Sequence, residues 1–164
     1  MSKSEKNLAE AFAGESQANR KYLAFAKKAD EEGFPQVARL FRAAAAAETV
    51  HAHAHFKVLG GIGDTASNLQ EAIGGETHEF MNMYPQMIEE AKAEGNKEAQ
   101  MSFMYANAVE KIHAELYKKA LDAMEGLAET AYFVCDVCGN TVEGEAPERC
   151  PVCGMDKSHF MKID

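Results

Sequence analysis

Two stretches of the sequence repeat one another in register, and this duplication limits the possible folds more than any other feature. Gly14-Glu15-Ser16 corresponds to Gly75-Glu76-Thr77, and the segment from Glu48 to Ala52 corresponds to the segment from Glu110 to Ala114. The first and second glutamates lie 33 residues apart in one copy and 34 in the other, so we expect one extra residue in a loop. The chain is therefore predicted to build its main domain from two similar halves.

Apolar residues recur every three to four positions through both copies, which is typical of amphipathic helices. Glycine and proline mark where these helices begin and end. We expect helices over about residues 3–32, 35–59, 67–95 and 97–126, with a kink at Pro85 in the third. The fold class is therefore mainly α, with two helical hairpins that form a four-helix bundle.

The composition excludes several classes of function. The chain has 26 acidic against 17 basic residues and a net charge of −9, so a nucleic-acid partner is not expected. It contains no apolar run long enough to span a membrane, and its N-terminus lacks the apolar core of a signal peptide. We therefore expect no membrane partner and a cytoplasmic location.

Acidic and imidazole side chains fall at positions where four helices can bring them together. Glu48 and His51 are three residues apart and share a helix face, as do Glu110 and His113. Glu15 and Glu76 lie within the apolar faces of the first and third helices, where an unpaired carboxylate is costly. A Glu from each of two helices and a Glu-x-x-His from each of the other two can hold two carboxylate-bridged metal ions.

A single Glu-x-x-His pair arises often by chance, so one pair alone would not indicate a metal site. Here two pairs stand in duplicated register, and each follows an in-face glutamate at nearly the same distance. Oxygen and nitrogen ligands of this kind suit iron or manganese better than metals that prefer thiolates. The sequence therefore predicts a two-metal site in the bundle.

All four cysteines lie in the tail, as two Cys-x-x-Cys pairs. Cys135 and Cys138 form one pair, Cys150 and Cys153 the other, and eleven residues separate them. This spacing can place four thiolates around one tetrahedral ion, and in a reducing compartment metal binding is favoured over disulfides. The residues alone leave the choice between a structural zinc and a redox-active iron open.

Together these motifs resemble the rubrerythrin family over essentially the whole chain. The resemblance is carried by AFAGESQANRKYLAFA, AETVHAHAHF, GETHEF followed by MYP, VEKIHAELY and the cysteine tail. It implies a ferritin-like di-iron bundle over residues 1–130 and a shortened rubredoxin-like domain over residues 131–164, with one iron on the four cysteines.

Residue by residue, the resemblance also implies roles at the di-iron site. The implied iron ligands are Glu15, Glu48, His51, Glu76, Glu79, Glu110 and His113, with Glu48 and Glu110 bridging. Glu79 has no counterpart in the first copy, where Ala18 stands, and in the family it exchanges with His51 when the iron is reduced. Tyr22 and Tyr84 are implied to donate hydrogen bonds to ligands or bound peroxide, although as bare residues they read as core aromatics.

Proteins similar to this one reduce hydrogen peroxide, and the resemblance implies that activity here. Electrons would come from an external NAD(P)H-linked reductase or a rubredoxin and pass through the tetrathiolate iron. Ferroxidase or iron-handling activity and a zinc-stabilised structural module are the alternatives. Because only a short link joins the second and third helices, we also predict a domain-swapped homodimer in which hairpins of two chains pair.

Overall fold

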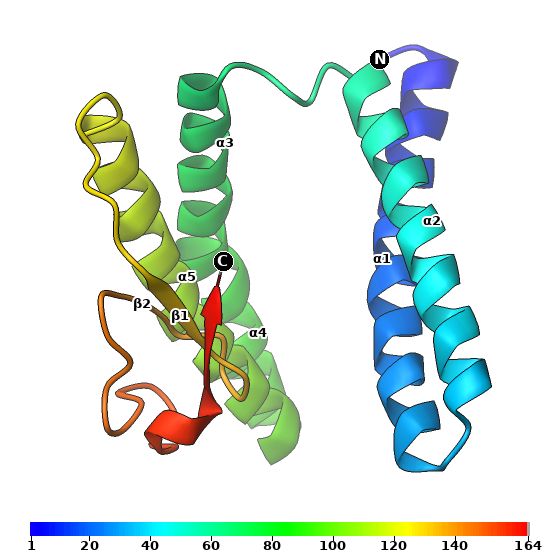
Figure 1. Ribbon diagram of the computed structural model, residues 1–164. Helices are drawn as coiled ribbons and strands as arrows, with labels where there is room; N and C mark the ends of the chain where they lie inside the picture. The colour runs from blue at the N-terminus through cyan, green and yellow to red at the C-terminus, as the bar shows by residue number, and fades with distance from the viewer. Residues whose placement is uncertain (164) are drawn as a thin grey trace. The chain divides into compact units, whose positions relative to one another are not determined.

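A computed structural model describes residues 1–163 of the chain (Figure 1). The α-helices are α1 (Lys3–Glu31), α2 (Pro35–Val58), α3 (Thr65–His78), α4 (Tyr84–Ala93) and α5 (Lys97–Asp122). A π-helical turn, η1 (Glu79–Met83), joins α3 to α4, and the tail carries β1 (Tyr132–Cys135), β2 (Thr141–Glu143), the 3-10 turn η2 (Lys157–His159) and β3 (Phe160–Ile163). The prediction of a mainly helical chain with a small cysteine-bearing tail is confirmed.

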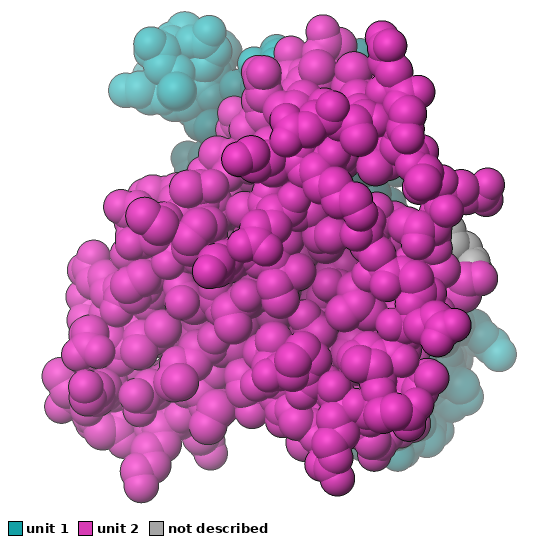
Figure 2. Space-filling view, turned by 90° about the vertical axis from the view of Figure 1, so that its left-hand side faces the viewer, with its two compact units in different colours: residues 1–63 teal, residues 64–164 magenta. Residues whose placement is uncertain are grey.

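The chain forms two compact units, residues 1–63 and residues 64–164 (Figure 2). Each unit contains one copy of the duplicated helical hairpin, and the second also contains the tail. The proposed domain boundary between residues 130 and 131 stays a prediction. No helix in the described part of the chain has the length and apolar character needed to cross a membrane.

The first unit is a hairpin of α1 and α2 held together by small side chains. Ala26, Ala29 and Ala38 are buried where the helices meet, and Phe41 packs against them. Alanine at these positions lets the two backbones approach closely. Gly33 has a φ of 81°, which makes the turn between the helices possible, and Pro35 then starts α2 with its fixed φ.

The second unit repeats this hairpin with one difference inside a helix. The connection between α4 and α5 has the same length as that between α1 and α2, and Gly95 occupies the position of Gly33, with a φ of 70°. The sequence suggested that the extra residue of the second copy lies in a loop, but the equal loop lengths show that it does not. It is taken up by η1, because a π-helical turn contains one more residue than an α-helical turn.

The ends of two helices also differ from the sequence expectation. Helix α3 begins at Thr65, two residues earlier than expected, because the Asp64 side chain accepts a hydrogen bond from the Ser67 backbone N–H and caps the helix. Helix α5 ends at Asp122, before the expected residue 126. The break expected at Pro85 takes the form of η1 just before it, and Pro85 stands in the first turn of α4, where its missing N–H costs least.

The tail is a three-stranded antiparallel sheet in the order β2-β1-β3. So short a segment buries little apolar surface, and its buried side chains include Cys135 and Cys150. The strands and turns bring the two cysteine pairs together. The stability of this small region therefore depends on a metal ion bound by the cysteines.

Candidate metal centres

The first unit places three predicted ligands together. Glu15 on α1 and the pair Glu48 and His51 on α2 each offer one ligand atom, and these atoms lie within 4.8 Å of one another. His51 Nδ1 lies 2.8 Å from Glu48 Oε2, as the three-residue spacing on a helix predicts. The Glu48 side chain is 19% exposed and His51 is 55% exposed, so this cluster is open on its histidine side.

The second unit repeats the cluster in a more enclosed form. Glu76 on α3 meets Glu110 and His113 on α5, again with ligand atoms within 4.8 Å. His113 Nδ1 lies 2.9 Å from Glu110 Oε2 and 3.6 Å from Glu76 Oε1. All three side chains are largely buried, with 17 to 26% exposed. The structure therefore brings three of the predicted residues together within each copy.

The carboxylates of the second unit repel one another. Burial and the negative charge of Glu110 raise the pKa of Glu76 to about 7. Burial, followed by the negative charge of Glu110, also raises the pKa of Glu79. Crowding acidic groups in a partly buried place is unfavourable unless a cation offsets their charge, and hard oxygen donors with one imidazole suit iron. The residues present therefore fit a metal ion.

Glu79 and Tyr84 belong to the surroundings of this second cluster. Glu79 begins the π-helical turn η1, and its interaction with the Glu110 charge places it close to the cluster, although it is not among the three residues whose ligand atoms lie within 4.8 Å. Burial, followed by the charges of Glu110, Glu79 and Glu76, raises the pKa of Tyr84, so its hydroxyl stays protonated at neutral pH. Their roles as ligand and hydrogen-bond donor stay predictions.

The Tyr22 ring lies among aromatic side chains of the first unit. Its centroid is 6.4 Å from that of Phe25 and 6.2 Å from that of Phe41. Tyr22 follows Glu15 by seven residues and Tyr84 follows Glu76 by eight, and the extra residue in η1 accounts for the difference. The two tyrosines therefore hold corresponding places, and the role of Tyr22 toward the metal stays a prediction.

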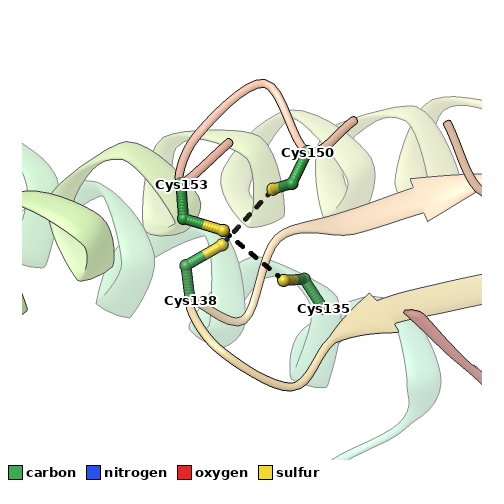
Figure 3. Close-up of side chains that lie close together, drawn as sticks. All are labelled: Cys135, Cys138, Cys150 and Cys153. Atoms are coloured by element: carbon green, nitrogen blue, oxygen red, sulfur yellow. Dashed lines mark hydrogen bonds between the residues drawn. The ribbon is translucent and has the colours of Figure 1, made fainter. Parts of the chain in front are cut away.

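Four cysteine sulfurs converge on one point in the tail (Figure 3). The Cys135 and Cys153 sulfurs are 3.7 Å apart, and those of Cys138 and Cys150 are 3.5 Å apart. A tetrahedral ion about 2.3 Å from each thiolate needs sulfurs about 3.8 Å from one another. The cysteines are free thiols, so the predicted tetrathiolate site is formed and the disulfide alternative is not.

Backbone N–H groups point at the sulfurs and favour their thiolate forms. Burial opposes ionisation of Cys150, but hydrogen bonds from the backbone of Cys153 and Val152, together with those from the Cys138 and Cys153 side chains, outweigh it, and the pKa falls to about 7. The backbone N–H of Asn140 likewise donates to Cys138, whose pKa is nevertheless raised, chiefly by burial. A metal ion that binds all four thiolates removes this conflict.

Sequence reasoning missed one polar contact near the second cluster. His113 Nε2 lies 2.8 Å from the Thr141 hydroxyl, which belongs to β2 of the tail. No local pattern around Thr141 indicates this contact, because it depends on how the sheet packs against α5.

Carboxylate and imidazole clusters on duplicated hairpins, together with a tetrathiolate site in the tail, define a class of non-haem iron proteins with two kinds of centre in one chain. Comparison with known proteins identifies the family. The family model described as "Rubrerythrin" matches residues 6–121, and the one described as "Rubrerythrin, rubredoxin-like domain" matches residues 133–161. The chain belongs to the rubrerythrin family, which has a di-iron carboxylate site and a four-cysteine site, and it is an iron-dependent oxidoreductase.

Individual relatives match along nearly the whole chain. Rubrerythrin-2 of Clostridium acetobutylicum is 38% identical over 170 residues, which cover 93% of this chain and 92% of the relative. Nigerythrin of Nitratidesulfovibrio vulgaris is 37% identical over 168 residues, covering 94% and 83%. The solved structure described as the fully reduced, all-ferrous state of nigerythrin matches with a TM-score of 0.61 at 34% identity, and the match covers 99% of this chain and 88% of that one.

Proposed function

We propose that this protein reduces hydrogen peroxide to water. The observation that carries the proposal is the presence, in one chain, of carboxylate and imidazole clusters for a di-iron site and of four convergent thiolates for a one-electron iron centre. When bound, a ferrous pair supplies the two electrons that cleave the O–O bond. A storage protein needs no thiolate centre, so the tail favours peroxide reduction over the ferroxidase alternative.

The chain's own residues prepare this site in three ways. Glu15, Glu48 and His51 from one unit and Glu76, Glu110 and His113 from the other supply the ligands. Glu79 adds a further carboxylate on the side of the second cluster. The Tyr84 hydroxyl keeps its proton at neutral pH and can donate a hydrogen bond beside the carboxylates.

The electrons that reload the two centres would come from an external donor. We propose that an NAD(P)H-linked reductase, directly or through a rubredoxin, reduces the iron on Cys135, Cys138, Cys150 and Cys153. Bound by these four cysteines, that iron would supply a one-electron centre for the di-iron site. The partner and the cytoplasmic location are predictions from the sequence.

Stopped-flow mixing tests this function. The fully reduced, anaerobic protein is mixed with hydrogen peroxide in one experiment and with oxygen in another, and the oxidation of both centres is followed by visible absorption. The proposal expects fast, stoichiometric oxidation by peroxide and slow oxidation by oxygen. Faster oxidation by oxygen would favour ferroxidase activity, and a colourless, unreactive protein would favour a zinc-stabilised structural module.

We also propose that the complete di-iron site forms between two chains, as a domain-swapped homodimer. Each unit contains only half of the ligands, so two hairpins must pair to complete a site. The link between α2 and α3 spans only residues 59–64, which limits how the two hairpins of one chain can pair. Pairing the first hairpin of one chain with the second hairpin of its partner gives two intact sites without a long connection.

Complementation distinguishes the swapped dimer from pairing within one chain. Glu15→Ala breaks the first half-site and Glu110→Ala breaks the second, so each variant alone is inactive. In a swapped mixed dimer one site receives both defects and the other is intact, so unfolding and refolding the two together restores roughly a quarter of the wild-type activity. No restoration would contradict swapping. Glu15→Ala refolded with Glu48→Ala is the matched control, because both defects lie in the first hairpin and no arrangement restores a site.

A further inference from the structure

A short segment of the tail, residues 139–143, packs against α5. A Cβ atom placed on Gly139 would lie 3.7 Å from Cγ1 of Val109, the Thr141 hydroxyl contacts His113, and Glu143 accepts a hydrogen bond from Lys119. Thr141 and Glu143 are two residues apart in β2 and so face the same way, and Gly139 lies in the turn just before this strand. The tail is therefore held on α5 in a fixed register, with Thr141 at the middle contact.

These contacts complete a hydrogen-bonded connection between the two kinds of centre within the second unit. His113 Nε2 lies 2.8 Å from Thr141 Oγ1, and Thr141 Oγ1 donates to the Gly139 carbonyl at 3.1 Å. That carbonyl and the N–H of Asn140 belong to the same peptide group, and the N–H donates to the Cys138 sulfur. One side chain and one peptide group thus separate a ligand of the carboxylate cluster from a thiolate.

The arrangement of donors also fixes which nitrogen of His113 faces the metal site. Nδ1 points toward Glu110 and Glu76, so it is the nitrogen that can bind a metal held by these carboxylates. With a metal on Nδ1, Nε2 would carry the hydrogen and donate it to Thr141 Oγ1, which leaves the threonine hydroxyl hydrogen for the Gly139 carbonyl. Each atom in the connection has one consistent role.

The corresponding histidine of the first unit has no such anchor. His51 contacts Glu48 through Nδ1, and within residues 1–163 its Nε2 has no hydrogen-bond partner. His51 is 55% exposed, whereas His113 is 26% exposed. The two copies therefore differ in how firmly their histidines are held, and the difference lies in Thr141.

We propose that Thr141 is a positioning residue that orients His113 and couples the tetrathiolate centre to the di-iron site. In each transfer one electron leaves the iron held by the four cysteines, which is oxidised from ferrous to ferric, and one ferric ion of the di-iron site becomes ferrous. No proton needs to move along the connection. The electron-transfer role rests on the proposed function, whereas the anchoring of His113 does not.

Thr141→Val tests the proposal, because valine keeps the shape of threonine and removes the hydroxyl. Thr141→Ser restores the hydroxyl, and Thr130→Val is the matched control in the exposed segment before β1. The rate of electron transfer from the tetrathiolate to the oxidised di-iron site is measured after flash reduction of the loaded protein. We expect Thr141→Val to slow it by about tenfold or more, because loss of a group that holds a metal-bound histidine typically costs about 10- to 100-fold in metal affinity or activity. We expect Thr141→Ser and Thr130→Val to leave it near the wild-type rate.

A second measurement needs neither turnover nor a variant. In wild-type protein loaded with zinc at both sites, nitrogen-resolved NMR of the histidines should show a hydrogen on His113 Nε2 that exchanges slowly with water. Slow exchange supports the anchor, and a hydrogen on Nδ1 or rapid exchange overturns the proposal even if Thr141→Val does not fold. An unchanged electron-transfer rate in folded Thr141→Val also overturns it.

The reaction of the reduced protein with peroxide separates failure of the role proposed for Thr141 from failure of the proposed function. The first reaction of fully reduced wild-type protein with peroxide uses electrons already at the di-iron site, so it tests the proposed function without any transfer along the connection through Thr141. If wild-type protein itself fails to react with peroxide, the proposed function is wrong, while the NMR result still decides whether Thr141 anchors His113.

Discussion

Replacing Glu76 with glutamine should have opposite effects on the metal-free and the metal-loaded protein. In the metal-free chain, burial and the Glu110 charge raise the pKa of Glu76 from 4.5 to about 7, so the folded state disfavours the ionised carboxylate. Glutamine carries no charge and can still donate a hydrogen bond to Glu110. The variant should therefore be more stable without metal at alkaline pH, and should bind iron more weakly because it lacks one anionic ligand.

The size and pH window of this effect follow from the pKa shift. A shift from 4.5 to about 7 corresponds to about 3 kcal/mol. The side chain is 18% exposed, and solvent screening reduces the expected gain to about 1.5 kcal/mol. Because the folded state binds this proton more tightly than the unfolded state, the wild type loses stability as pH rises from 4.5 through 7. The advantage of Glu76→Gln should be absent below pH 4.5 and complete above pH 7.

Urea unfolding of the full chain, followed by circular dichroism at several pH values, measures this advantage. The carboxylate site is stripped with a chelator, and visible absorption confirms that the thiolate site stays loaded. Glu71→Gln, an exposed carboxylate on the same helix, is the control and should change stability little at any pH. Equal stability of Glu76→Gln and wild type at pH 8, or a gain that is largest at acidic pH, would refute the reasoning.

Two further substitutions test other parts of the structure. Cys150→Ser should remove the metal of the tetrathiolate site and abolish repeated turnover with an external donor. A chemically reduced sample of this variant should still react once with peroxide. Loss of this first reaction as well would contradict the separate roles of the two centres. Ala38→Leu should destabilise the first unit by about 1 to 3 kcal/mol in urea unfolding, because Ala38 is 0% exposed between α1 and α2. Ala46→Leu on the exposed side of α2 should cost less than about 0.5 kcal/mol, and equal losses at the two positions would argue against close packing there.

Much of the helical structure and the pairing of glutamate with histidine on one helix face could be predicted from the sequence, because both depend on local spacing. Apolar periodicity and the glycines at 33 and 95 place the helices, and a three-residue spacing puts Glu110 and His113 on one face whatever surrounds them. The two Cys-x-x-Cys pairs are equally local. Each of these sequence patterns lies within a few helical turns or, for the cysteines, within two short loops.

The features that escaped prediction depend on single residues or distant contacts. The π-helical turn adds one residue to a helix, and a periodicity read over many residues cannot tell this from one extra residue in a loop. The contact between Thr141 and His113 depends on how the tail packs on α5, which no spacing in the sequence specifies. Both features lie beside the second metal cluster, where the two copies of the hairpin differ.

The proposed function requires that the two duplicated halves together hold a pair of redox-active iron ions. Mössbauer spectroscopy of protein reconstituted with isotopically enriched iron tests it most directly, since it counts oxygen- and nitrogen-ligated iron separately from thiolate-ligated iron. We expect two oxygen- and nitrogen-ligated irons for every tetrathiolate iron, magnetically coupled when oxidised, and oxidised from ferrous to ferric by one equivalent of hydrogen peroxide. A spectrum that contains only the tetrathiolate iron, or uncoupled irons that peroxide does not oxidise, would contradict it.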